Sequence, residues 1–158
     1  MMPAALSQIT VYSRECVRLL MPLYEAAALK NMAVADIPKI PGAAVLALGQ
    51  SIEHDTEGIS ISIADLIAHL QIQHSRIDDL DDWISADDRS ITKSNIVEFI
   101  VDALELYARA AMLFDYARRK TDKAPESPRR ENLVNAAHAC SIWDERAIYD
   151  AIERRFDP

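Results

Sequence analysis

Apolar residues recur at alternating three- and four-residue steps between residues 92 and 120, which is the spacing of one face of an α-helix. A second apolar row runs beside the first. Polar residues therefore keep only a narrow stripe, made of Glu98, Asp102, Glu105 and Arg109. A helix that is apolar around most of its circumference must be covered on several sides. We therefore predict that residues 92–120 form the central helix of a bundle, or that they also face a partner subunit.

The N-terminal part of the chain shows the same helical periodicity, interrupted by prolines. It predicts a helix over about 7–32, with a kink or a restart at Pro22, because proline cannot donate a backbone hydrogen bond inside a helix. Two further prolines predict a loop at 36–41. A short helix over about 42–52 is expected to follow.

The next segment, 53–60, is polar and contains a glycine, which predicts a connector. Ser62 and Asp65 then have the spacing of a capping box, in which each side chain satisfies a free backbone N–H at a helix start. We predict a third helix that begins at Ser62 and whose apolar face extends to Ile84. A segment rich in serine and aspartate predicts a break at 85–92.

The last helical region is predicted to begin with Ser127 as its N-cap and Pro128 as its first residue. Read as one helix, this region would place Asp144 on the apolar face, where a charge is rarely found. Ser141 and Asp144 have the spacing of another capping box. We therefore expect a break near Ser141 and a final helix to about Phe156.

These elements predict one all-α domain, an antiparallel bundle of five to six helices centred on residues 92–120. A charged linker near 121–128 separates the central helix from the last helices. The chain has 158 residues and three glycines, whereas β-hairpins and phosphate-binding loops depend on glycine. A chain of this length can form a core without disulfides. Cys16 and Cys140 are therefore expected to be small buried thiols.

The net charge of −8 is concentrated in one segment. Residues 53–88 contain ten acidic residues and one basic residue, while the rest of the chain is nearly neutral. A nucleic-acid-binding protein normally has a dominant basic face, so direct nucleic-acid binding is not expected. A smaller basic group is formed by Arg118, Arg119, Lys120, Lys123, Arg129 and Arg130.

The sequence predicts a soluble, cytoplasmic protein that does not enter a membrane. Its longest weakly polar run, 43–52, is half of the roughly 20 residues that a membrane-spanning helix needs. Charged residues interrupt the N-terminal apolar stretch that could otherwise serve as a secretory signal, namely Arg14, Glu15 and Arg18.

Two short patterns resemble parts of known metal sites, and each lacks its second element. His54 and Asp55 form the dipeptide of metal-dependent phosphohydrolases, which also need an earlier histidine ligand, but His54 is the first histidine in the chain. The acidic segment 78–82 has the DDxxD spacing of prenyl synthases. Those enzymes carry a second acidic motif on a facing helix, and the aspartate pair at 87–88 is too close in sequence to serve as one.

An enzyme with a metal or acid–base site is the rival hypothesis, and it would use His74, Asp78, Glu98 and Asp102. His74 and Asp78 are four residues apart, so they share one helix face, and a carboxylate can orient a histidine for such chemistry. A histidine at the edge of the apolar face and a solvated or interface stripe explain the same residues more simply. We therefore predict no catalytic residue, metal or cofactor.

The leading hypothesis is a helical interaction module, such as a regulatory subunit, an adaptor or an inhibitor, that binds a protein with a basic surface. Its aspartates would steer the partner, and Trp83 would anchor it. A narrower alternative is a nucleic-acid mimic that acts through the acidic 78–88 face. A third is a homo-oligomer in which the 92–120 helix contributes to a shared core. The predicted interaction patch consists of Asp78, Asp79, Asp81, Asp82, Trp83, Asp87 and Asp88.

Overall fold

The computed structural model describes residues 1–26, 29, 32–34, 36–85 and 91–157, and every regular element in these ranges is an α-helix. The prediction of an all-α bundle of five to six helices is confirmed. No helix in these ranges is long and apolar enough to cross a membrane. Six helices have ten residues or more: α1 (Met2–Glu25), α2 (Gly42–Ile52), α3 (Glu57–Asp78), α5 (Lys93–Met112), α7 (Arg130–Ala139) and α8 (Arg146–Phe156). Two are short: α4 (Leu80–Ser85) and α6 (Phe114–Ala117).

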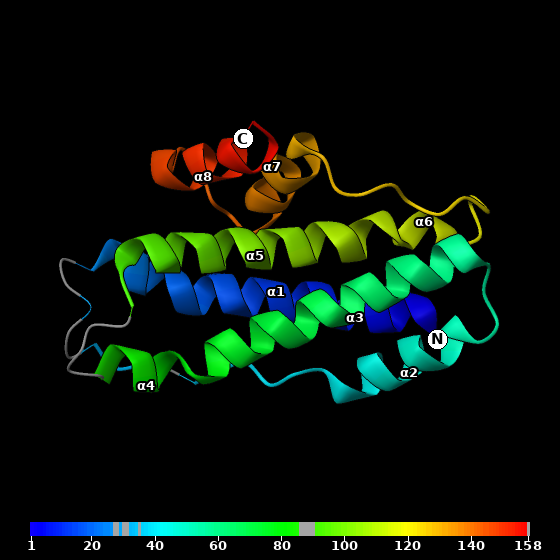
Figure 1. The fold of residues 1–158 in the computed structure, drawn as a ribbon, viewed down its shortest axis with the longest axis horizontal. Coiled ribbons are helices and arrows are strands. Elements are labelled where there is room, and N and C mark those ends of the chain that lie inside the picture. Colours follow the sequence, from blue (N-terminus) through cyan, green and yellow to red (C-terminus); the bar gives the residue numbers. More distant parts are fainter. Residues whose placement is uncertain (27–28, 30–31, 35, 86–90, 158) are drawn as a thin grey trace.

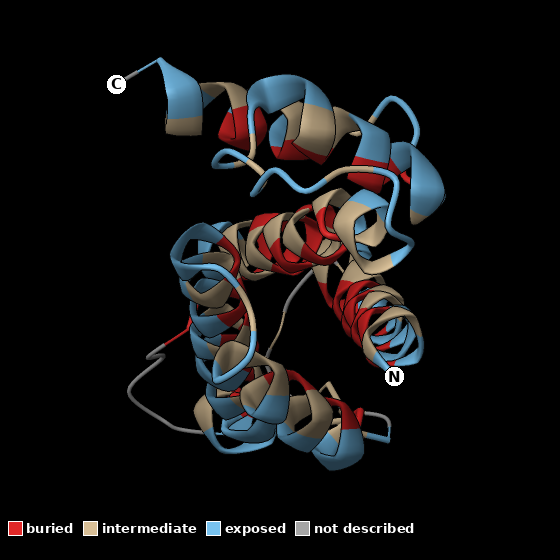
Figure 2. Cartoon of the chain, turned by 90° about the vertical axis from the view of Figure 1, so that its right-hand side faces the viewer, coloured by how far each residue is buried: buried red, intermediate tan, exposed pale blue. Residues whose placement is uncertain are grey.

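Helix α5 is the centre of the bundle, as predicted. It packs against α1, α3, α7 and α8. Figure 1 shows α1 and α3 running in one direction while α5 runs in the other, with α7 and α8 lying across α5 on its remaining side. The buried residues lie on the helix faces that turn toward one another (Figure 2). Helices of the same chain therefore account for the wide apolar circumference of α5, and no partner subunit is needed to explain it.

Helix α1 is continuous through Pro22 and ends at Glu25, so both the predicted restart and the extension to residue 32 are wrong. The proline lies in the last turn, where its missing N–H deprives a single carbonyl group of a donor. Leu20 and Leu23 are almost fully buried on either side of it, and their packing holds this turn on the core. Ala26 has an extended backbone (φ −62°, ψ 143°), and this ends the helix.

Helix α3 begins at Glu57, inside the predicted connector, and the capping box at Ser62 is wrong. The Ser62 hydroxyl donates within the helix to the carbonyl of Gly58, at 3.0 Å. Gly58 is helical. A Cβ atom at this residue would lie 3.0 Å from the Cβ of Ala124, so the glycine permits a close approach of the linker and does not form a turn.

The predicted third helix is divided in two, because α3 ends at Asp78 and α4 begins at Leu80. Ile77, Leu80 and Ile84 are nevertheless all buried, so the apolar face continues across the break as predicted. The predicted break at 85–92 lies mostly outside the described residues, which resume at Ile91.

Helix α5 starts where predicted, because Thr92 and Asn95 form a reciprocal capping box. The predicted extension to residue 120 is wrong: α5 ends at Met112 and only the short α6 follows. Arg119 has a φ of 57°, a left-handed conformation that a helix cannot contain.

Residues 118–129 contain no helix, and α7 begins at Arg130 with Arg129 as its N-cap. The start at Pro128 is therefore wrong. The break near Ser141 is confirmed, and α8 ends at Phe156 as predicted. Ser141 and Asp144 do not form a capping box: both have left-handed backbones, with φ of 61° and 58°, in the turn between the helices.

Candidate functional site

Four aspartates of the predicted patch gather where α3 passes into α4. Asp78 and Asp79 close α3, and Asp81 and Asp82 lie in the first turn of α4. All four are exposed. None of them forms an ion pair with another described residue. We call Asp78, Asp79, Asp81 and Asp82 the acidic end. Asp87 and Asp88 of the same prediction lie outside the described residues.

Trp83 borders the acidic end and is half-buried. Its ring centroid lies 6.0 Å from that of Phe99, with the planes tilted by 40°. Leu80 and Ile84, its neighbours on α4, are buried. The tryptophan therefore completes the apolar face at this end of the bundle and presents part of its ring beside the aspartates.

The polar stripe of α5 is covered by the C-terminal helix, contrary to the solvated or interface stripe favoured from sequence. Arg155 of α8 reaches across all three carboxylates. Its Nη1 lies 2.7 Å from Glu105 Oε2, and its Nη2 lies 3.4 Å from Glu98 Oε2 and also bonds Asp102. We call Glu98, Asp102 and Glu105 the carboxylate stripe.

Further cations complete the neutralisation of the stripe. Arg109 donates from Nε and Nη2 to Glu105 Oε1, at 3.0 and 2.8 Å, and Arg76 of α3 pairs with Asp102. His69 Nε2 lies 3.4 Å from Glu105 Oε1. The stripe therefore joins α3, α5 and α8 in one ionic network.

The network shifts the ionisation of its most enclosed member, Glu105. The hydrogen bond from His69 and then the bonds and charge of Arg109 lower the pKa of Glu105 to about 2, against the opposing effect of burial. The same Glu105 bond raises the pKa of His69 above its ordinary value, although burial works in the other direction. These shifts arise because ionised partners stabilise each other's charged forms.

The residues of the enzyme hypothesis fall into two groups. The His74 ring nitrogen Nδ1 shares a hydrogen bond of 3.1 Å with the Tyr12 hydroxyl, and Asp78 is exposed on the acidic end. Glu98 and Asp102 are held by Arg155 in the carboxylate stripe. Within the described ranges, no group of three or more histidine, cysteine or carboxylate side chains is arranged to hold a metal ion.

Other candidates from the sequence have structural contacts. Asp55, of the His54–Asp55 dipeptide, accepts a hydrogen bond of 2.7 Å from the Tyr116 hydroxyl. Cys16 is buried and Cys140 is half-buried, and both are free thiols. Burial raises the pKa of Cys16 to about 12 and that of Cys140 to about 11, so neither is prepared to act as a thiolate.

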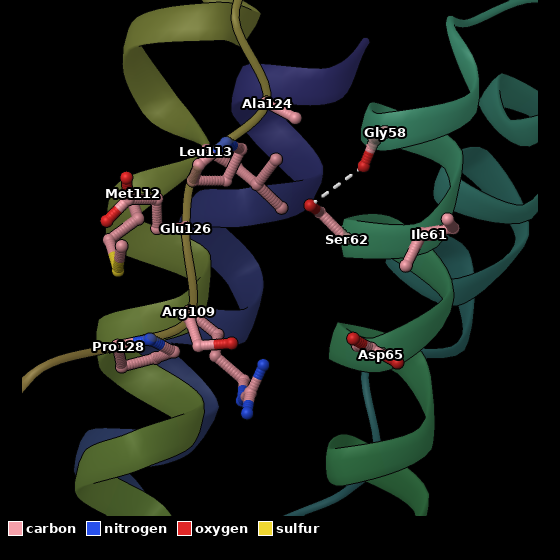
Figure 3. Close-up of a pocket in the computed structure, with 12 residues that line it drawn as sticks. Gly58, Ile61, Ser62, Asp65, Arg109, Met112, Leu113, Ala124, Glu126 and Pro128 are labelled. Atoms are coloured by element: carbon pink, nitrogen blue, oxygen red, sulfur yellow. Dashed lines mark hydrogen bonds between the residues drawn. The ribbon is translucent and has the colours of Figure 1, made fainter.

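A pocket of about 240 Å³ lies where the linker crosses between α3 and α5. Figure 3 shows Arg109 and Met112 on one wall, Ile61 and Asp65 on the other, and the linker running from Ala124 past Glu126 to Pro128 in front of α5. Sequence reasoning did not find this pocket, because its walls come from segments about fifty residues apart.

Sequence reasoning also missed Arg155 and the exposed aromatic residue Trp143. Trp143 is 60% exposed, and it stacks on the His138 ring with centroids 4.6 Å apart. The position of Trp143, two residues after the predicted break at Ser141, was the available signal. Arg155 had none, since one arginine near the end of a predicted helix is unremarkable in sequence.

No protein-family model, curated protein or solved structure matches this chain. Its geometry is therefore the sole basis for proposing a function.

Proposed function

We propose that the chain is a small cytoplasmic interaction module, without catalytic activity of its own, that binds a basic surface of another protein through the acidic end. A regulatory subunit, an adaptor or an inhibitor would act in this way. One observation carries the proposal. The carboxylate stripe is neutralised by arginines, whereas the acidic end is exposed and has no ion-pair partner among the described residues.

The acidic end acts mainly on the rate and the selectivity of association. Four like charges close together raise the local potential and attract a basic partner before contact, an effect that falls as salt increases. Trp83 supplies apolar contact beside them, and aromatic residues often contribute a large share of interface energy. Asp87 and Asp88 follow in sequence and belong to the same predicted patch.

Affinity capture with three forms of the full chain tests the proposal. The first is the natural chain, and the second carries asparagine at the four aspartates of the acidic end. The third is a control with the same net charge, in which four exposed carboxylates elsewhere are neutralised: Glu53→Gln, Glu57→Gln, Asp115→Asn and Asp122→Asn. Proteins retained from the host extract by each form are identified and quantified by mass spectrometry.

We expect a basic protein that the natural chain and the control retain equally and that the acidic-end variant loses. Equal retention by all three forms contradicts the proposal. Equal loss from both variants shows that only the total charge matters, which contradicts it as well. Addition of duplex DNA or RNA to the captured complex distinguishes the nucleic-acid-mimic form of the hypothesis, because nucleic acid then displaces the chain from its partner.

A further inference from the structure

We propose that the pocket beneath the linker binds a small zwitterion, an α-amino acid with an apolar side chain. The first support is the pair of opposite charges on its two walls. Arg109 and Asp65 both line the pocket, and Figure 3 shows them on facing helices. The third charged side chain of the lining, Glu126, pairs with Arg129. Arg109 and Asp65 form no ion pair with each other, although Arg109 is paired with Glu105.

Each of these side chains keeps capacity to bind a ligand. Two of the Arg109 nitrogens, Nε and Nη2, donate to Glu105, which leaves Nη1 without a hydrogen bond to any described residue. The Asp65 carboxylate is exposed and has neither a hydrogen bond nor an ion pair with the described part of the chain. A guanidinium N–H binds a carboxylate well, and a carboxylate accepts from an ammonium group. One α-amino acid carries both groups.

The apolar residues of the pocket determine which side chain the amino acid should have. Ile61, Met112 and Leu113 line the pocket together with Pro125 and Pro128 of the linker. Ile61 is 56% exposed, so a bound aliphatic side chain would remove apolar surface from water. Methionine is flexible and adapts to ligands of different shape. These residues favour a branched aliphatic or similar side chain over a charged one.

The volume limits the ligand to a small metabolite. The pocket measures about 240 Å³. Benzene fits a cavity of about 150 Å³, whereas pockets for drug-sized ligands start at about 300 Å³. A free amino acid the size of leucine lies between these limits, and a nucleotide is too large.

The linker is held over the pocket by close packing at one end. A Cβ atom at Gly58 would lie 3.0 Å from the Ala124 Cβ, so the linker touches the α3 backbone at this residue. The two prolines that follow have fixed φ angles. A roof that is already ordered reduces the entropy that a ligand must overcome on binding.

The test uses three probes that differ only in their charged groups: L-leucine, 4-methylpentanoate without the ammonium group, and 3-methylbutylamine without the carboxylate. Binding to the full chain is measured by saturation-transfer NMR and by titration of the backbone amide signals. We expect L-leucine to bind at least about tenfold more tightly than either analogue, because each analogue lacks one of the two charged groups that form hydrogen bonds in the pocket. The amide signal of Gly58 is expected to shift. Equal binding of either analogue, or no detectable binding of L-leucine at about 20 mM, overturns the proposal.

Variants locate the site and separate it from the acidic end. Asp65→Asn removes an exposed, unpaired carboxylate, so it leaves the fold intact, and it is expected to weaken L-leucine binding about fivefold or more. Asp78→Asn is the matched control and leaves binding unchanged. Arg109→Lys keeps the charge next to Glu105 but has one nitrogen donor in place of three, so it is expected to weaken L-leucine binding, whereas the control Arg118→Lys leaves it unchanged. Natural affinity in the Asp65→Asn variant overturns the proposal, and because the acidic end is untouched, that result leaves the proposed protein interaction standing.

Discussion

The acidic end and the carboxylate stripe contain the same kind of charged group in opposite surroundings. Each carboxylate of the stripe contacts at least one arginine, and its most enclosed member, Glu105, has a pKa of about 2. The aspartates of the acidic end are exposed and form no ion pair within the described part of the chain. Carboxylates held by cations contribute to the structure, whereas carboxylates that lack cations are available to a partner. The position of the arginines therefore distinguishes carboxylates that hold helices together from carboxylates for which we propose an interaction role.

The largest expected effect follows from removing the cation that holds the stripe. Arg155→Gln leaves three half-buried carboxylates without their shared partner and should lower the free energy of unfolding by about 3 kcal/mol. Removing one partner of a buried ion pair costs about 3–5 kcal/mol. We expect the lower end of this range because the Arg155 side chain is 23% exposed. Urea unfolding followed by circular dichroism measures it.

The neighbouring arginine provides the control for this substitution. Arg154 is 64% exposed, and its one ion pair with a described residue is the one with Glu98, at 3.6 Å. Arg154→Gln should therefore change the stability by less than about 0.5 kcal/mol. If the two variants are equally stable, Arg155 does not hold the stripe and the contrast between the two acidic regions fails.

Acid should weaken the stripe in a defined pH range. The folded pKa of Glu105 is about 2, below its ordinary value of 4.5. The stability that this group contributes is therefore fully present above pH 4.5 and is lost as the pH falls through about 2. Its side chain is 19% exposed, so we expect a contribution of about 2 kcal/mol after allowance for solvent screening.

A comparison with Glu105→Gln isolates this contribution. The variant should be less stable than the natural chain above pH 4.5, and the gap should narrow as the pH approaches 2. Denaturant titrations at closely spaced pH values measure both curves. A constant gap over this range would show that Glu105 does not titrate as described.

Neutralising the acidic end should have a much smaller effect on folding. Asp78 lies at the C-terminal end of α3, where a negative charge opposes the helix dipole, whereas Asp81 and Asp82 lie in the first turn of α4, where it is favourable. These effects cancel in part. The four-asparagine variant should therefore keep its unfolding free energy within about 0.5 kcal/mol of the natural value while it loses partner binding. A loss comparable to that of Arg155→Gln would assign the acidic end a structural role.

A feature of this fold could be predicted from sequence when the residues that determine it lie close together along the chain. The central position of α5 could be predicted because its two apolar rows lie in one short segment, and Thr92 with Asn95 fixes its start within four residues. Gly58 was misinterpreted because the contact that requires a glycine comes from Ala124. The role of Arg155 depends on residues fifty positions away in sequence, and single-sequence periodicity contains no information about such pairs.

For the same reason, the sequence could not show which of the two acidic regions is covered by another helix. The sequence identified the aspartates near Trp83 by their density, and the structure leaves the four described ones exposed. It also identified Glu98, Asp102 and Glu105 as a polar stripe, but charge density alone did not indicate that α8 would cover it. Exposure can be predicted from a helical pattern only where no later segment packs on the polar face.

The smallest expected effect concerns His69, which joins α3 to the stripe. Its folded pKa lies above the ordinary value of 6.5, chiefly because of the bond to Glu105. The stability it contributes is therefore fully present below pH 6.5 and is lost as the pH rises through the higher folded value. The side chain is 37% exposed, so solvent screening keeps this contribution below about 1 kcal/mol.

His69→Gln should therefore be less stable than the natural chain at pH 6 and should approach it in stability at higher pH. The same substitution in a Glu105→Gln background should lose this pH dependence, because the partner that raises the histidine pKa is gone. Thermal unfolding of the four proteins across this range measures the coupling. An undiminished pH dependence in the double variant would mean that another group raises the pKa of His69. The stripe would then end at Glu105 and α3 would be joined to it through Arg76 alone.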